Sequence, residues 1–279
     1  MKTLHWHILL VVFGSLLLGQ TPEIASIEEY WYEVSANDSS RLPVDYYTAL
    51  QINTYAGNLE KVRSLIEDGS DVNAMTRNAK RTPLMMAAVM GYVEILELLL
   101  NSGANIDQTD GSGNTALLHA ATNQRLDMTE LLVDRGANAF ISGNSAGSPP
   151  EILLLVFSID GKRYSLTRKL IDLGVDLNGR MKLESYMDWT PLIYATSVGD
   201  YEAAELLLKS GADYKLFDSY GRPALVIGII SDQKEIIKLL IEYGADPNES
   251  IPGYGSSIDI AKQLGKSEIL LILENYKKT

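Results

Sequence analysis

The sequence predicts an all-α repeat solenoid of helix-turn-helix units with hairpin-like finger loops, and two observations support this fold class. A glycine follows a leucine-rich stretch at six places, and these glycines are 34, 33, 38, 37 and 33 residues apart. A Thr, Ser or Pro start precedes each stretch, and in five of the six units the glycine comes 21 residues after that start. A fixed period of this length is typical of repeat architectures, in which each unit buries its apolar face against its neighbours.

The first 19 residues are typical of a secretory signal peptide. Lys2 is the only charged residue among them, and the run from Ile8 to Leu18 is apolar apart from a glycine and a serine. This run is short of the roughly 20 apolar residues that a bilayer-spanning helix needs. We therefore expect cleavage after Gly19 and a secreted or periplasmic protein, with an uncleaved signal anchor as the alternative.

Residues 20–47 are predicted to form an N-terminal capping helix and a linker. Apolar side chains recur there at near-helical spacing, at Ile24, Ile27, Tyr30, Trp31 and Val34. A helix over residues 22–34 would cover the open edge of the first repeat, because a solenoid needs terminal units that close its core. A short partner-binding segment is the alternative for this stretch.

Residues 48–279 are predicted to form seven repeats. Their starts are Thr48, Thr82, Thr115, Ser148, Thr190, Pro223 and Ser256. A Thr or Ser hydroxyl at the start can cap a helix, and the glycine after the leucine run can end the next one in the left-handed conformation. The fourth unit is nine residues longer than the others, which predicts a lengthened first helix and a bulged finger over residues 180–188. Drift in a tolerant loop and a functional insertion both remain open as reasons.

The units beginning Thr82-Pro83-Leu84 and Thr190-Pro191-Leu192 resemble the ankyrin repeat, a 33-residue unit with a Thr-Pro-Leu-His-x-Ala signature. The resemblance covers about residues 45–276, although the signature histidine is replaced in every unit. It implies a non-enzymatic module that binds another protein along a concave face made by first helices and finger tips.

The residue composition excludes several chemistries. The chain has no cysteine, and of its three histidines His119 alone lies outside the expected signal peptide. Disulfides, zinc-cysteine sites and multi-histidine metal sites are therefore excluded. We interpret His119 as a structural polar residue and predict no catalytic residue, no cofactor and no metal, with an enzyme as the alternative of a different class. The net charge of −12 argues against nucleic acid and anionic membrane, and it would suit a basic protein partner.

The candidate partner-binding residues are placed by the resemblance, at finger tips and just before the inter-helix turns. Aromatic residues, methionine and arginine at such positions are typical of interface hot spots. The candidates are Tyr55, Arg81, Met90, Tyr186, Trp189, Tyr220 and Arg222. The alternative is that several aromatic side chains pack within or between fingers, above all Trp189, which directly precedes a helix cap.

The function expected from these features is protein binding by an exported, monomeric chain. Its leading specific form is an immunity or inhibitor protein for a toxin that acts in the cell envelope. An envelope scaffold or accessory factor and a secreted effector that acts on a host protein remain open.

Overall fold

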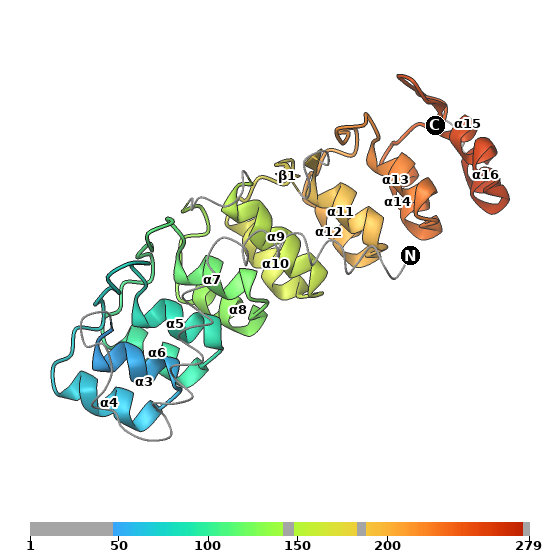
Figure 1. The fold of residues 1–279 in the computed structure, drawn as a ribbon. Helices are drawn as coiled ribbons and strands as arrows, with labels where there is room; N and C mark the ends of the chain where they lie inside the picture. The colour runs from blue at the N-terminus through green and yellow to red at the C-terminus, as the bar shows by residue number, and fades with distance from the viewer. Residues whose placement is uncertain (1–46, 142–147, 183–187, 276–279) are drawn as a thin grey trace.

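The computed structural model describes residues 47–141, 148–182 and 188–275. In these residues seven helix pairs stack side by side into one elongated array, with α3–α4 at one end and α15–α16 at the other (Figure 1). The predicted all-α repeat solenoid is confirmed. The expected signal peptide and the expected capping helix lie outside the described residues.

The first helices of the pairs are α3 (Ala49–Tyr55), α5 (Pro83–Met90), α7 (Ala116–Thr122), α9 (Pro150–Asp160), α11 (Pro191–Val198), α13 (Ala224–Ile230) and α15 (Ser257–Gln263). The second helices are α4 (Leu59–Glu67), α6 (Val93–Asn101), α8 (Leu126–Asp134), α10 (Tyr164–Asp172), α12 (Tyr201–Lys209), α14 (Lys234–Glu242) and α16 (Ser267–Glu274). The loops that follow α4, α6, α8, α10, α12 and α14 are called finger 1 to finger 6 below, and they project along one side of the array (Figure 1).

Hydroxyl caps start most of the first helices. The side chain accepts a hydrogen bond from the backbone N–H three residues later at Thr48, Thr82, Thr115, Thr190 and Ser256. These caps satisfy N–H groups that a helix leaves unpaired in its first turn. The fourth helix differs, because its N-cap is Pro149 rather than the expected start Ser148, and it has no side-chain cap.

A left-handed residue separates the two helices of each pair. Glycine occupies this position in four units, for example Gly91 with φ 81°. Gln124, Lys162 and Asp232 replace it in the other three, with φ of 56°, 54° and 62°. Each of these residues carries the steric cost that glycine avoids, so the turn is imposed by the packing of the two helices around it.

Small residues let the first helices pack closely. Helix α5 lies between α3 and α7, and Ala87, Ala88, Ala120 and Ala121 on α5 and α7 are fully buried. Leucines from the second helices, among them Leu99 on α6, complete a continuous apolar core. The first helices are therefore enclosed in the core along most of their length.

The fourth unit contains the predicted lengthening. Helix α9 has 11 residues, whereas α5 has 8 and α7 has 7. Finger 4 contains an antiparallel pair of two-residue strands, β1 (Met181–Lys182) and β2 (Asp188–Trp189), and finger 6 contains β3 (Ser250–Ile251) and β4 (Gly255–Ser256). Across the described ranges, the search found no helix long and apolar enough to cross a bilayer.

Candidate partner-binding surface

The first helices present an almost uncharged surface. Helices α3, α5, α7, α11 and α13 contain no Asp, Glu, Lys or Arg. The second helices are rich in both signs, and ion pairs join neighbouring units there, such as Lys169 on α10 with Glu130 and Asp134 on α8. A ligand at the fingers and first helices therefore meets apolar and neutral side chains, plus the charges that the fingers themselves carry.

A ladder of Asp and Asn side chains fixes the bases of neighbouring fingers. The Asn105 N–H donates to Asn73 Oδ1 at 2.7 Å, and the Asn138 N–H donates to Asp107 Oδ1 at 2.8 Å. The Asp213 N–H repeats this contact with an asparagine of finger 4 at 2.9 Å. The recurring acidic and amide residues after each repeat glycine are thus turn and ladder residues.

Fingers 4 and 5 are joined at their tips. Arg180 Nη1 donates to the Phe217 carbonyl at 2.6 Å, and the guanidinium carbon lies 5.9 Å from the centroid of the Phe217 ring. The Asp188 N–H donates to Ser219 Oγ at 3.0 Å. Phe217 is 54% exposed in spite of these contacts. A large apolar side chain is thus held at the surface by a rigid polar frame.

Asp218 organises the turn of finger 5. One carboxylate oxygen accepts from the N–H groups of Tyr220 and Arg222, at 2.9 and 3.0 Å. The other accepts from Arg222 Nε and Nη2, at 2.8 and 2.6 Å. The guanidinium also lies 4.7 Å from the centroid of the Tyr220 ring, and Tyr220 is 47% exposed. Cation–π and ion-pair contacts together fix the orientation of this tyrosine.

We call Arg180, Phe217, Ser219, Tyr220 and Arg222 the finger 4–5 surface. Sequence reasoning included Tyr220 and Arg222 and missed Phe217 and Arg180. The signal that could have found Phe217 is its place between the repeat glycine and the unit start, where four of the six units have a polar residue or a methionine. Its exposure follows from the tertiary contacts of finger 4, which no repeat pattern encodes.

The other predicted binding residues fall in different environments. Trp189 is 5% exposed and packs in the core, as the alternative had it, because β2 places it directly before the buried cap of α11. This corrects its assignment to the exposed surface. Tyr55 and Met90 are half-buried at the ends of α3 and α5, and Arg81 is half-buried in finger 1. Tyr186 lies outside the described residues.

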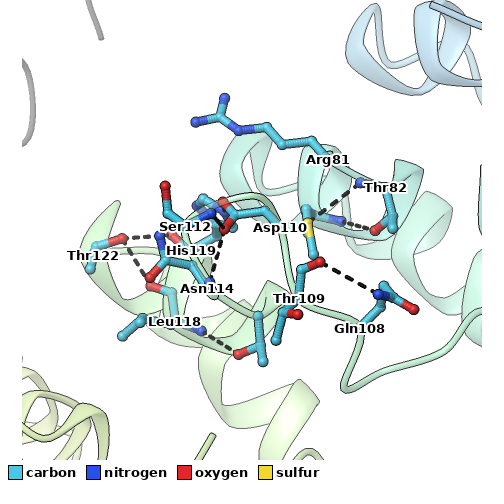
Figure 2. Close-up of polar contacts among 12 residues, drawn as sticks. Arg81, Thr82, Gln108, Thr109, Asp110, Ser112, Asn114, Leu118, His119 and Thr122 are labelled. Carbon is cyan, nitrogen blue, oxygen red and sulfur yellow. Dashed lines mark hydrogen bonds and ion pairs between the residues drawn. The ribbon is translucent and has the colours of Figure 1, made fainter. Parts of the chain in front are cut away.

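His119 joins helix α7 to finger 2. Its Nε2 lies 2.8 Å from Asp110 Oδ2, and the two side chains are 9% and 5% exposed (Figure 2). Burial disfavours the charged carboxylate, but hydrogen bonds from His119, Asn114 and Ser112 outweigh it and hold the pKa of Asp110 below its usual value. The pair lies in the interior and fixes finger 2.

Two tyrosines make buried contacts with aspartates of neighbouring units. The Tyr194 hydroxyl donates to Asp160 Oδ1 at 2.6 Å, and burial together with this contact raises its pKa. The Tyr164 hydroxyl donates to the Asp200 carboxylate at 2.9 Å, and partial burial with this contact raises the pKa of Tyr164 to about 12. Both hydroxyls stay protonated at neutral pH, so they act as structural donors. No cluster of three or more potential metal ligands occurs within residues 47–141, 148–182 and 188–275.

Comparison with known proteins agrees with this geometry. The family described as ankyrin repeats matches residues 24–110, 50–142 and 153–251. A palmitoyltransferase of Lachancea kluyveri is 33% identical over 204 residues, which is 73% of this chain and 22% of that protein. An ankyrin repeat protein of fowlpox virus is 33% identical over 59% of this chain and 48% of its own length. This chain thus spans less than half of each of these two relatives.

Other relatives match over nearly their whole length. The Escherichia coli ankyrin repeat protein YahD is 25% identical over 73% of this chain and 98% of its own. Among solved structures, the ankyrin repeat domain of Bcl-3 is 21% identical with a TM-score of 0.64, covering 83% of this chain and 100% of that domain.

A second solved structure contains an enzyme together with a binding protein. One chain from the complex of a predatory endopeptidase of Bdellovibrio bacteriovorus with an immunity protein is 25% identical to this chain, with a TM-score of 0.56. The similarity covers 71% of this chain and 98% of that one. Ankyrin repeats generally form non-catalytic modules that bind proteins. The sequence match over most of the chain and the stacked helix pairs with projecting fingers lead to one conclusion: this protein belongs to the ankyrin repeat family.

Proposed function

We propose that this protein is an exported immunity or inhibitor protein that holds one partner protein in a tight one-to-one complex. The observation that supports the proposal most directly is its similarity to a chain from an endopeptidase–immunity protein complex, at 25% identity over 71% of its length. A solenoid suits this task, because its stacked units form an extended surface that changes little on binding.

The finger 4–5 surface is the proposed centre of the interface. Phe217 and Tyr220 are large, exposed and held in place by Arg180 and Arg222. Aromatic side chains fixed in this way lose little conformational entropy when a partner covers them. Residues of this kind carry most of the binding energy in measured protein interfaces.

The test of partner binding is capture of tagged protein from the envelope fraction of source cells, followed by light scattering of the isolated complex. We expect one partner at one-to-one stoichiometry, and the partner's activity should fall as the protein is titrated in. Phe217→Ala combined with Tyr220→Ala should abolish capture. Phe140→Ala is the matched control, because Phe140 is 46% exposed on finger 3, away from this surface. Several partners in loose, substoichiometric association would contradict the immunity proposal.

Export is proposed from the apolar run that follows Lys2. The expected result is that protein from the periplasm or medium lacks residues 1–19, as read from its intact mass. Full-length protein in the cytosol would contradict export, and full-length protein in the membrane would contradict cleavage and favour a signal anchor.

A further inference from the structure

The tip of finger 1 is basic although the protein is acidic. Residues 76–81 contain Arg77, Lys80 and Arg81 and no acidic residue, whereas the whole chain has a net charge of −12. Elsewhere the chain neutralises many of its cations internally. Seven cations on or beside the second helices form ion pairs: Arg135 with Glu97, Arg163 with Asp127, Lys169 with Glu130 and Asp134, Lys209 with Glu205, Lys234 with Glu268, Lys238 with Glu235 and Lys266 with Asp232.

Arg81 and Arg222 occupy equivalent places but have different partners. Each closes its finger turn through the same pair of backbone contacts: the Arg81 N–H donates to Thr76 Oγ1 at 2.9 Å, and the Arg222 N–H donates to Asp218 Oδ1 at 3.0 Å. The carbonyls of the two arginines accept from the N–H groups of Thr76 and Asp218, at 2.9 and 3.0 Å. Asp218 then also neutralises the Arg222 guanidinium, at 2.6 Å.

Thr76 carries no charge, so it cannot neutralise Arg81 in this way. The Arg81 Nε is buried and finds no hydrogen-bond partner within the described part of the chain. The side chain extends away from the Asp110–His119 contact (Figure 2). A buried donor without an acceptor is costly, and this cost would be relieved by an anionic ligand that reaches it.

Lys80 departs from the local backbone preference. It has a φ of 56°, and the residue at the same place in finger 5, directly before the closing arginine, is Gly221 with φ 76°. A side chain in the left-handed region is disfavoured, and such departures concentrate at functional sites. Here the departure places an ammonium group at the exposed tip of the finger.

The basic finger is held in place from both sides. Gln51 Nε2 on α3 donates to the Ala74 carbonyl at 2.7 Å, and the Gly111 N–H of finger 2 donates to the Ala79 carbonyl at 2.8 Å. The adjacent helices α3, α5 and α7 add no carboxylate that could compete for its cations. The three cations are therefore presented on a preorganised loop beside a neutral surface.

We propose that the basic finger, Arg77, Lys80 and Arg81, binds an acidic segment of the partner protein. This inference rests on the proposed function and replaces the basic partner that the net charge suggested. The ligand is a short carboxylate-bearing segment rather than a nucleic acid or an anionic membrane. A long polyanion would also meet the carboxylates of the second helices, and its affinity depends on many phosphate contacts.

The direct test uses a fluorescein-labelled peptide of about ten glutamates and the full-length mature protein, followed by fluorescence anisotropy at low and physiological salt. Replacing Arg77, Lys80 and Arg81 together by Gln should weaken binding about tenfold or more, since three charge contacts are lost. The matched control changes Lys209, Lys234 and Lys238 to Gln, which alters the net charge equally and should leave the peptide affinity within about twofold.

A second variant tests the mechanism without removing any cation. Thr76→Asp supplies finger 1 with the carboxylate that finger 5 has in Asp218. It should weaken peptide binding by neutralising Arg81 internally, while the melting temperature is kept or raised. Thr76→Asn keeps a hydrogen-bond acceptor without the charge, so it should retain peptide binding.

The outcomes separate this inference from the proposed function. Equal peptide affinity in the triple variant and its control would overturn the basic-finger assignment. Binding of a single-stranded oligonucleotide through these residues, without peptide binding, would overturn the choice of ligand. A captured partner that needs Phe217 and Tyr220 but not the three cations would leave the function standing and defeat the inference. Peptide binding through the finger without any captured partner would do the reverse.

Discussion

His119 Nε2 and Asp110 Oδ2 lie 2.8 Å apart and join the first helix of the third unit to the finger before it. The other oxygen of Asp110 accepts from the N–H groups of Ser112 and Asn114, at 2.8 and 2.9 Å. One carboxylate thus closes the finger turn and ties that turn to α7. In finger 5 the same turn is closed by Asp218, and the helix position equivalent to His119 holds Ile227, so Arg222 takes the second oxygen instead.

The Asp110 contact predicts an acid-sensitive part of the stability. The carboxyl has a folded pKa below the model value of 3.8. Its contribution is therefore complete above about 3.8 and is lost as the pH falls through the lower folded pKa. Urea unfolding as a function of pH should show a fall in the free energy of unfolding in this range. The fall should be smaller in Asp110→Asn, which cannot ionise, and unchanged in Asp71→Asn on finger 1. Identical pH profiles for the wild type and Asp110→Asn would contradict the assignment.

Trp189 is predicted to act on stability rather than on binding. Its side chain is 5% exposed, so Trp189→Ala should lower the free energy of unfolding by about 3–5 kcal/mol. Trp189→Phe should cost less, because it also removes an indole N–H that has no partner among the described residues. Urea unfolding measures both. Partner affinity of Trp189→Phe, measured where the protein is folded, should match the wild type; a large loss of affinity there would restore Trp189 to the interface.

Phe217 and Tyr220 are predicted to act on binding rather than on stability. Both are about half exposed, at 54% and 47%. Truncating both to Ala should weaken the partner complex about tenfold to several hundredfold, as hot-spot losses do. The melting temperature should shift by only about 2 °C, because little core area is lost. Calorimetric titration and thermal unfolding of the same samples check the two effects, and a melting shift as large as that of Trp189→Ala would make these residues structural.

Lys80 and Gly221 give a reciprocal test of backbone strain. Lys80→Gly should raise the free energy of unfolding by up to about 1 kcal/mol, because glycine accepts a positive φ without the steric penalty. Gly221→Lys should lower it by a similar amount, and its Cβ would meet no atom within 4 Å, so the effect comes from the backbone alone. Urea unfolding of the two single variants measures both signs. A destabilised Lys80→Gly would mean that the lysine side chain itself supports finger 1.

Local patterns predicted the repeated parts of the fold. Helix starts at Thr82 and Thr190 follow from hydroxyl capping, and helix reversals such as that at Gly91 follow from left-handed glycine. The lengthened α9 follows from the apolar run in the fourth unit. All of these signals act over a few residues and recur with the period.

The candidate site was only partly predictable. Arg222 was chosen as a binding residue, yet Asp218 holds most of its donors. Trp189 was chosen as an exposed aromatic side chain, yet the hairpin of finger 4 places it in the core. Both outcomes depend on contacts across a turn or between units, which a repeat alignment does not contain.

The sequence by itself determined that this protein is a solenoid of helix pairs without disulfide or cysteine-based metal chemistry, because the period, the caps and the composition are local properties of the chain. Tertiary structure alone decided which charges stay available on the surface. Arg81 and Arg222 are alike in sequence, but Asp218 neutralises one while Thr76 leaves the other without a carboxylate. Whether an ionic side chain serves the fold or a partner depends on the distance to its counter-charge, and only folding sets that distance.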